Sequence, residues 1–232
     1  MFDIQPINTT CPQCGSECQA FQFGKALRYE CDPCASAEKA ARRAKERRGE
    51  CLAAWEDCTP ELFREPVQPA LLAEYLRPAL DLSGPEGAGF IGATGSGKTR
   101  VAYALLRKSA LAGLRPFAVT GSNLRRAASE AHSDASGRSK AILHAARYAG
   151  ALLLDDVGKG STTEVGDEAL FALLDERRAH KRVTFWTSNG NGKWIAGRYK
   201  ADRGPAIAVR LANLAGCYAP GTGRIYTDNQ KP

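Results

Sequence analysis

The stretch that most constrains the fold is GATGSGKT, at residues 92–99. It follows the apolar run AGFIG and precedes RVAYALLRKSALAG, whose composition and apolar spacing are typical of a helix. The pattern G-x-x-x-x-G-K-[ST], placed between a strand and a helix, is that of a phosphate-binding loop. The simpler interpretation is a Gly-rich turn with an incidental lysine. It does not account for eight matched positions in this context.

This loop predicts contacts with the phosphates of a nucleotide and with Mg²⁺. Glycines let backbone N–H groups face phosphate oxygens, and the helix that follows adds the positive end of its dipole. Lys98 is expected to reach the β and γ phosphates, and Thr99 to offer its hydroxyl to Mg²⁺. The predicted cofactors are ATP and Mg²⁺. The candidate nucleotide ligands are Gly92, Ala93, Thr94, Gly95, Ser96, Gly97, Lys98 and Thr99.

Two adjacent aspartates interrupt the apolar run LLLDDVG at residues 152–158. Like charges side by side at the end of a buried strand are unfavourable unless a cation lies there. In proteins with a phosphate loop, a second acidic strand ends near that loop, so Asp155 is expected to hold Mg²⁺ through water. Asp156 is expected to point another way and to polarise the attacking water as a catalytic base. A solvated turn after a buried strand is the alternative.

The run RVTFWTSN ends on polar side chains at the carboxyl edge of a predicted strand. Open α/β sheets bind their ligands at this edge. Asn189 therefore fits the role of orienting water beside the γ phosphate. Taken alone, it is more readily explained as a helix cap before GKWIAGRY.

Alternating strands and helices after residue 87 predict an α/β fold. Buried runs without hairpin turns between them indicate a three-layer sandwich, with a parallel sheet of about five strands between helices. The strand-like runs are AGFIG, PFAVT, ALLLD, RVTFWTS and GRIYTD. The helix-like runs lie near 98–112, 122–131, 138–148, 164–179 and 205–214.

The cysteines are concentrated ahead of this region. Cys11-x-x-Cys14 and Cys31-x-x-Cys34 are separated by 16 residues, which is the spacing of a zinc ribbon. Each pair is expected to present two thiolates to one tetrahedral Zn²⁺, in a segment too small to fold on its own core. Free reduced thiols are the alternative. Cys18 could replace Cys14 in the set, although its spacing is poorer.

The segment at 36–86 is predicted to be a basic helix followed by a proline-rich connector with one or two short helices. KAARRAKERR, at 39–48, places six basic side chains around a helix. They either contact DNA phosphates or an acidic partner, or form a solvated face with i,i+4 ion pairs. Cys51, Trp55 and Cys58 recur at helical spacing and indicate packing rather than metal binding.

Composition limits the class of protein. The 232 residues suffice for one full domain and a small appendage. The 32 Lys and Arg against 25 Asp and Glu favour contact with polyanions such as nucleic acid. No apolar run approaches a membrane span and no export signal is seen, so we expect no membrane contact and a cytoplasmic protein with reduced thiols. The expected domains are a zinc ribbon at 1–35, the basic helix and connector at 36–86, and the α/β domain at 87–232.

These motifs, in this order, resemble the AAA+ ATPases of the DnaC/IstB group, which includes bacterial and bacteriophage helicase loaders and transposition ATPases. The resemblance rests on GATGSGKT, ALLLDDVGKG, LLDERRAHKRVTFWTSN and AIAVRLANL, and it covers roughly residues 87–227. It implies self-association through the ATP site, with Arg210 reaching into the neighbouring subunit's site. Arg198 and Arg203 could replace Arg210, and an ordinary surface arginine is the alternative.

Two features of the chain bear on what the resemblance implies. Most AAA+ proteins have glutamate at the position of Asp156, and aspartate is shorter by about 1.5 Å, so slow hydrolysis stimulated by DNA or a partner is expected. Only 22 residues follow Arg210, too few for a helical lid, which the DnaC/IstB group also lacks.

The function implied is that of a helicase loader in DNA replication. Such a loader uses ATP to control its assembly on single-stranded DNA and on a replicative DNA helicase, which its N-terminal module recruits. Three alternatives stay open: a transposition ATPase of the same family, a P-loop kinase, and a zinc-ribbon adaptor that binds ATP without hydrolysing it.

Overall fold

The chain divides into two compact units, residues 1–49 and 50–232. The boundary falls inside helix α1 (Asp32–Cys58), so this one helix contributes to both units. Most of the connector predicted at 59–86 lies outside the described residues. The computed structural model describes residues 6–23, 26–68, 70, 87–200, 202–219 and 223–226.

Within those ranges, every helix is either too short or too polar to span a bilayer.

The first unit is built on a three-stranded antiparallel sheet in the order β1-β2-β3. Its strands are β1 (Ile7–Thr10), β2 (Glu17–Phe23) and β3 (Ala26–Glu30). Because β1 and β3 both pair antiparallel with β2, they end on the same side of the sheet. Cys11 directly follows β1 and Cys31 directly follows β3, so the sheet brings both cysteine pairs to one edge.

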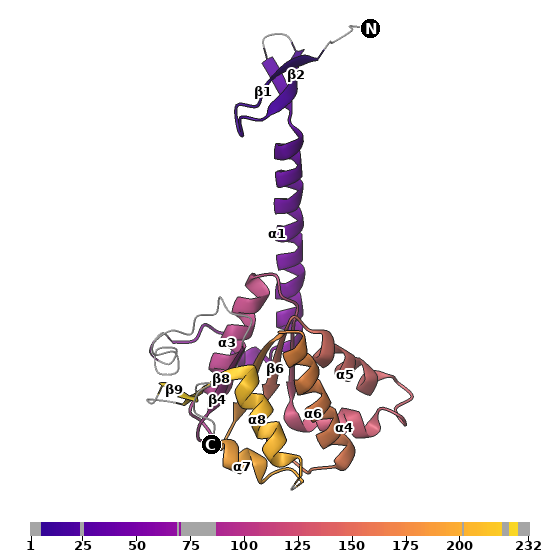
Figure 1. The fold of residues 1–232 in the computed structure, drawn as a ribbon, viewed down its shortest axis with the longest axis vertical. Helices are drawn as coiled ribbons and strands as arrows, with labels where there is room; N and C mark the ends of the chain where they lie inside the picture. The colour runs from indigo at the N-terminus through magenta and orange to yellow at the C-terminus, as the bar shows by residue number, and fades with distance from the viewer. Residues whose placement is uncertain are drawn as a thin grey trace. The chain divides into compact units, whose positions relative to one another are not determined.

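The second unit contains a six-stranded sheet in the order β5-β6-β7-β4-β8-β9. Figure 1 labels β4, β6, β8 and β9 of this sheet. Its strands are β4 (Gly87–Ile91), β5 (Pro116–Thr120), β6 (Ala151–Asp155), β7 (Val183–Ser188), β8 (Ala215–Ala219) and β9 (Gly223–Tyr226). The strands from β5 through β8 run parallel, and β9 pairs antiparallel with β8.

The predicted α/β fold with five parallel strands is confirmed, but the identity of the fifth strand was wrong. The run at 223–228 forms the antiparallel β9, and its last two residues lie outside the described residues. The fifth parallel strand is β8, which begins directly after a helix and consists mostly of small residues. Its sequence has no turn signal before it and no apolar alternation. It is a strand because it pairs with β4, and not because its own residues favour one.

Each helix predicted between residues 98 and 214 is present, with bounds that differ by about one residue at most. Two further helical elements among the described residues are the 3₁₀-helix η1 and the short α7, which the sequence indicated only as the helix that Asn189 would cap. The helices are η1 (Glu61–Phe63), α3 (Lys98–Leu111), α4 (Gly121–Glu130), α5 (Arg138–Tyr148), α6 (Glu164–Ala179), α7 (Gly192–Ala196) and α8 (Gly204–Leu214).

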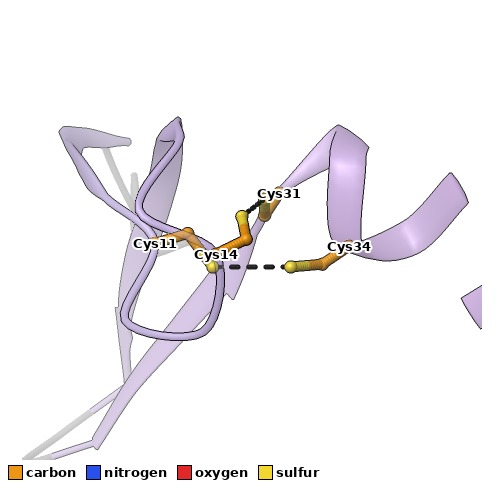
Figure 2. Close-up of side chains that lie close together, drawn as sticks. All are labelled: Cys11, Cys14, Cys31 and Cys34. Carbon is orange, nitrogen blue, oxygen red and sulfur yellow. Dashed lines mark hydrogen bonds between the residues drawn. The ribbon is translucent and has the colours of Figure 1, made fainter. Parts of the chain in front are cut away.

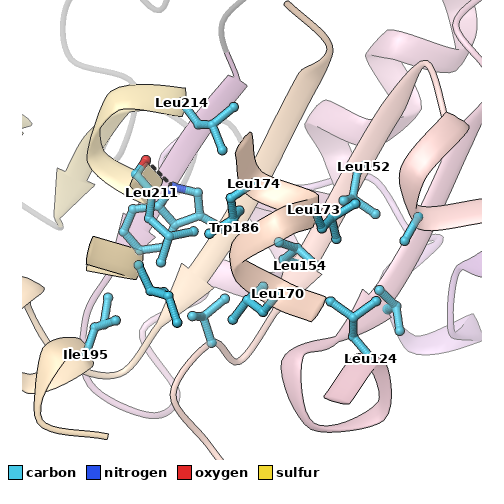
Figure 3. Close-up of a cluster of buried hydrophobic side chains, with 14 of the residues drawn as sticks. Leu124, Leu152, Leu154, Leu170, Leu173, Leu174, Trp186, Ile195, Leu211 and Leu214 are labelled. Carbon is cyan, nitrogen blue, oxygen red and sulfur yellow. Dashed lines mark hydrogen bonds between the residues drawn. The ribbon is translucent and has the colours of Figure 1, made fainter. Parts of the chain in front are cut away.

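Side-chain alternation along β6 divides the core into two layers. Leu152 and Leu154 pack with Trp186 and with the apolar faces of helices α4 to α8 (Figure 3). Leu153 and Phe185 lie on the opposite face, with α3 and the end of α1. The sheet is therefore covered on both sides, as expected for parallel strands.

A fully buried arginine links helix α6 to the end of α5 and to the start of β7. Arg177 of α6 donates from Nε to Thr184 Oγ1 at 2.9 Å, and from Nη1 to the carbonyls of Ala146 and Ala149 at 2.9 and 3.0 Å. Burial lowers its pKa to about 9. The guanidinium thereby satisfies carbonyl groups at the end of α5 that the helix itself leaves unpaired.

The end of α1, which belongs to the second unit, packs within it through Cys51 and Trp55, both only 4% exposed. The Trp55 indole N–H donates to the carbonyl of Tyr103 at 3.3 Å, and the Arg107 guanidinium lies 5.5 Å from the ring centroid. The prediction that these side chains serve packing is confirmed.

We expect Trp55→Ala to lower the free energy of unfolding of the second unit by about 3–5 kcal/mol, because it leaves a large cavity under α1. Trp55→Phe keeps most of the ring and gives up one hydrogen bond worth about 1 kcal/mol. Urea denaturation measures both. The control is Glu56→Ala, an exposed neighbour, expected to change stability by less than about 0.5 kcal/mol. Equal effects of the alanine substitutions at 55 and 56 would contradict the packing role.

Candidate functional site

The predicted phosphate loop, residues 92–99, connects β4 to α3. Gly95 and Gly97 both have a φ of 84°, a left-handed conformation that side chains disfavour. Gly97 is the N-cap of α3 and offers no side chain to the first turn. The first N–H groups of α3 therefore have no side-chain cap, and together with the helix dipole they make this end suitable for an anion.

Lys98 reaches back across the loop. Its ammonium donates to the carbonyl of Ala93 at 3.1 Å, and the residue is 5% exposed. Burial lowers the pKa of Lys98, and the charge of Asp156 partly opposes this. A cation held in this way, inside a loop whose N–H groups can bind an anion, is arranged to neutralise a phosphate.

Asp155 and Thr99 meet beside the loop, although they are far apart in the sequence. The Thr99 hydroxyl donates to Asp155 Oδ1 at 3.0 Å, and the Thr187 hydroxyl donates to the same oxygen at 2.6 Å. Burial raises the pKa of Asp155, while these two hydrogen bonds act against the rise. A threonine hydroxyl next to a carboxylate is a suitable oxygen set for Mg²⁺. These residues could hold the ion.

Asp156 adopts a φ of 55°, which is uncommon for any residue other than glycine. Its backbone N–H donates to Thr187 Oγ1 at 2.9 Å. Its carboxylate accepts from the Lys159 ammonium at 2.8 Å, and both side chains are partly exposed. The two carboxylates therefore have different partners, as the alternation argument suggested, but the pairing of Asp156 with Lys159 was not predicted.

Asn189 lies one residue beyond the end of β7. Its Oδ1 is buried and has no hydrogen-bond partner among the described residues. The cap of α7 is Asn191 instead, whose Oδ1 accepts from the Trp194 N–H at 3.0 Å. Asn189 is thus not the helix cap, and its oxygen remains available to a ligand or water.

Arg210 does not contact the phosphate loop of its own chain. It lies on α8, where Nε and Nη2 donate to the two Asp175 oxygens at 2.7 and 3.0 Å. Its guanidinium carbon lies 3.7 Å from the centroid of the Phe171 ring. The two substitutes are also engaged, because Arg203 pairs with Glu168 and Arg198 donates to a backbone carbonyl.

The residue that sequence reasoning missed is Thr187. Its single hydroxyl donates to Asp155 and accepts from the N–H of Asp156, so it fixes both aspartates at once. Thr187 is the first residue of the polar stretch TSN, in which the sequence favoured Asn189 as the residue that contacts the γ phosphate and water. The available signal was its position near the carboxyl end of β7, the strand that pairs with β6.

The four cysteines of the first unit converge (Figure 2). Their sulfurs all lie within 4.8 Å of one another, with Cys11 to Cys34 at 3.7 Å and Cys14 to Cys31 at 3.4 Å. Sulfurs bound to one tetrahedral Zn²⁺ at about 2.3 Å are separated by about 3.8 Å. Hydrogen bonds to Ser16 lower the pKa of Cys14 to about 6, which favours the thiolate. The group could hold a metal ion.

Cys18 does not belong to this group. It lies on β2, and burial raises the pKa of its thiol.

Comparisons with known proteins agree with this geometry. Residues 86–211 match the family model described as IstB-like ATP binding protein. The crystal structure of DnaI is similar over 58% of this chain and 73% of that chain, with 24% identity and a TM-score of 0.52. A comparison with curated proteins gives no significant match.

Two further solved structures share the fold. The DnaC helicase loader is 17% identical, with a TM-score of 0.50, over 72% of this chain and 98% of that chain. AMPPCP-bound DnaA from Aquifex aeolicus is 17% identical, with a TM-score of 0.50, over 61% of this chain and 42% of that chain. At these identities the structural likeness shows the fold alone.

We expect the purified chain to contain a single Zn²⁺, because four thiolates at these distances complete a tetrahedral shell. Cys14→Ser should lose the metal, since three remaining thiolates bind it less tightly. Cys18→Ser is the matched control and should keep it. Elemental analysis after gel filtration measures the zinc content per chain. Loss of metal from the Cys18 variant, or retention by the Cys14 variant, would contradict the ligand set.

Proposed function

Because the chain belongs to the IstB-like ATP-binding family of AAA+ ATPases, we propose that it hydrolyses ATP to load a replicative DNA helicase onto single-stranded DNA. The observation that carries the ATPase part is the meeting of Thr99, Asp155 and Thr187 beside the phosphate loop. This arrangement gathers hydroxyl and carboxylate oxygens where the β and γ phosphates would bind.

In the proposed ground state, the phosphate loop binds the ATP phosphates through its N–H groups and Lys98. Lys98 exchanges the Ala93 carbonyl for a phosphate oxygen, a stronger acceptor for an ammonium. Thr99 and Asp155 would hold Mg²⁺, which neutralises charge on the phosphates when bound. A cation there also removes the unfavourable burial of the Asp155 carboxylate.

In the proposed chemical step, Asp156 accepts a proton from the attacking water, and the buried Asn189 oxygen helps to orient that water. Asp156 is held by Lys159, so this ion pair must loosen for the carboxylate to act as a base. The short side chain and its pairing with a lysine both favour slow basal turnover.

We propose that Arg210 acts on the ATP of a neighbouring subunit. It is presented on α8 by its two hydrogen bonds to Asp175, and its side chain is 23% exposed. Its Nη1 is not used by Asp175 and donates to the Ala206 carbonyl of the same helix at 3.3 Å, so this nitrogen could turn to a second subunit's phosphate. Self-association through the ATP site follows from this role.

We propose that DNA contacts the basic part of α1. Every residue from 35 to 50 is exposed, and this stretch carries six cations against three glutamates. A helical stretch that is exposed along its whole length gains little from burial, so its charge pattern points to a polyanionic partner. Lys39, Arg43 and Arg47 recur at intervals of four and align along one ridge.

We propose that the cysteine-containing unit binds the helicase, because it lies apart from the ATPase motifs in the sequence. A transposition ATPase of the same family is equally compatible with the family match. Co-purification from cells that contain both candidate partners separates the two functions. Recovery of a transposase in place of a helicase would overturn the loader assignment.

Three substitutions test the ATPase. With single-stranded DNA present, Lys98→Ala should abolish nucleotide binding and turnover, because it removes the cation of the phosphate loop. Asp156→Asn should keep binding but slow turnover by about 10²-fold or more, as expected for a lost general base. Arg210→Ala should slow turnover by about 10³-fold. Phosphate release and equilibrium nucleotide binding are the measurements.

The matched control for Arg210 is Arg203→Ala, which removes an arginine that also pairs with α6. Normal turnover in Arg210→Ala with loss in Arg203→Ala would move the trans role to Arg203. Phosphate that appears on an acceptor rather than free in solution would indicate a kinase. Absence of turnover with and without DNA would indicate an adaptor.

For DNA, we expect the triple substitution of Lys39, Arg43 and Arg47 by glutamine to weaken binding of single-stranded oligonucleotides. The slope of log affinity against log salt should fall by about two, at about 0.7 per phosphate contact. Fluorescence anisotropy across a salt series measures this slope. The matched control replaces Arg42, Lys45 and Arg48, of which Arg42 already pairs with Glu46. An unchanged slope in the first variant would contradict the contact.

A further inference from the structure

Two loops that carry proposed catalytic side chains pack against the same indole. Gly158 follows Asp156 in the loop after β6, and Gly190 follows Asn189 after β7. A Cβ on Gly158 would lie 2.5 Å from Cζ3 of Trp194, and a Cβ on Gly190 would lie 2.3 Å from its Cγ. Both loops therefore pass the Trp194 ring at a distance that only glycine permits.

Arg198, just beyond α7, completes the contact. Its Nε donates to the carbonyl of Gly158 at 2.9 Å, and its guanidinium carbon lies 5.5 Å from the centroid of the Trp194 ring. The carbonyl of a loop residue in a left-handed conformation is thereby held by a charged donor. We refer to Trp194 and Arg198, which together contact the loops after β6 and β7, as the α7 clamp.

A direct hydrogen-bond link also joins the two loops. The Ser188 hydroxyl donates to the carbonyl of Val157 at 3.2 Å and accepts from the N–H of Gly190 at 3.3 Å. The loops of Asp156 and Asn189 therefore touch each other and share one surface. Displacement of the indole would remove a support that both loops share.

The loop after β6 has a second support on the side of α4. The buried Arg125 donates from Nη2 to the carbonyl of Lys159. Among the described residues, no hydrogen bond of Arg125 reaches the loop of Asn189. Trp194 packs against both loops, as the Ser188 hydroxyl bonds to both.

We propose that the α7 clamp positions Asp156 and Asn189 for water attack, which makes Trp194 and Arg198 positioning residues of the ATPase reaction. This inference rests on the proposed ATPase function. It also gives Arg198 a role in its own subunit, because its Nε donates to the carbonyl of Gly158. Errors of about 1 Å in such a position can cost on the order of 10²-fold in rate.

The first test separates rate from binding. Trp194→Ala and Arg198→Ala should lower kcat for ATP hydrolysis by on the order of 10- to 100-fold, with nucleotide affinity within about twofold of the native chain. Trp194→Phe keeps an aromatic ring over the glycines and should retain more turnover than Trp194→Ala. Lys193→Ala changes the exposed residue next to Trp194; it is the matched control and should behave as the native chain.

The second test separates a role within one subunit from a role across subunits. Arg198→Ala chains are mixed with Lys98→Ala chains, which lack a working phosphate loop but keep Arg198. A positioning residue acts only in its own subunit, so mixing should restore no turnover. Restoration would overturn the proposal, because it would show that Arg198 acts on a neighbour.

The third test does not depend on turnover. Amide hydrogen exchange at residues 157–160 and 189–190 should become faster in both clamp variants and stay native in Lys193→Ala. Native exchange in the clamp variants would overturn the proposal even if ATP is hydrolysed. Faster exchange in a chain that shows no turnover would support the clamp and reject the ATPase function instead.

Discussion

The hydrogen bond from Thr187 to Asp155 is the interaction on which the arrangement of the site depends. Burial disfavours the charged form of the Asp155 carboxyl, and this bond favours it. The same hydroxyl accepts from the backbone N–H of Asp156 and so holds the start of the loop after β6. The bond exists because β7 lies between β6 and β4 in the sheet. That strand order brings the phosphate loop, the two aspartates and Asn189 to one edge, although they are spread over nearly a hundred positions of the chain.

Much of the fold could be predicted from local patterns. The phosphate loop has a motif whose glycines and lysine determine a strand, a turn and a helix, and the long helices have clear apolar periodicity. The cysteine pairs were equally informative because their spacing suits one tetrahedral ion. β8 could not be predicted, since it is short and gains its conformation from pairing with β4.

The side-chain partners were much harder to predict than the elements. The pairing of Arg210 with Asp175 depends on how α8 lies against α6, and no local pattern encodes that packing. Arg177 is a charged residue in the sequence but is fully buried, because it meets carbonyl groups at the end of another helix. The roles of Asp156, Asn189 and Arg210 stay predictions, although the structure shows what each side chain contacts.

The left-handed backbone conformation of Asp156 gives a second reason for an aspartate at this position. Aspartate tolerates such a conformation better than most residues, because its short polar side chain can bond locally, as it does here with Lys159 three residues later. For a longer side chain, the same torsion angles cost about 1–2 kcal/mol. The reach of the proposed base is therefore set by the turn it occupies. A glutamate in the same turn would reach further toward the water, but the folded state would carry that cost.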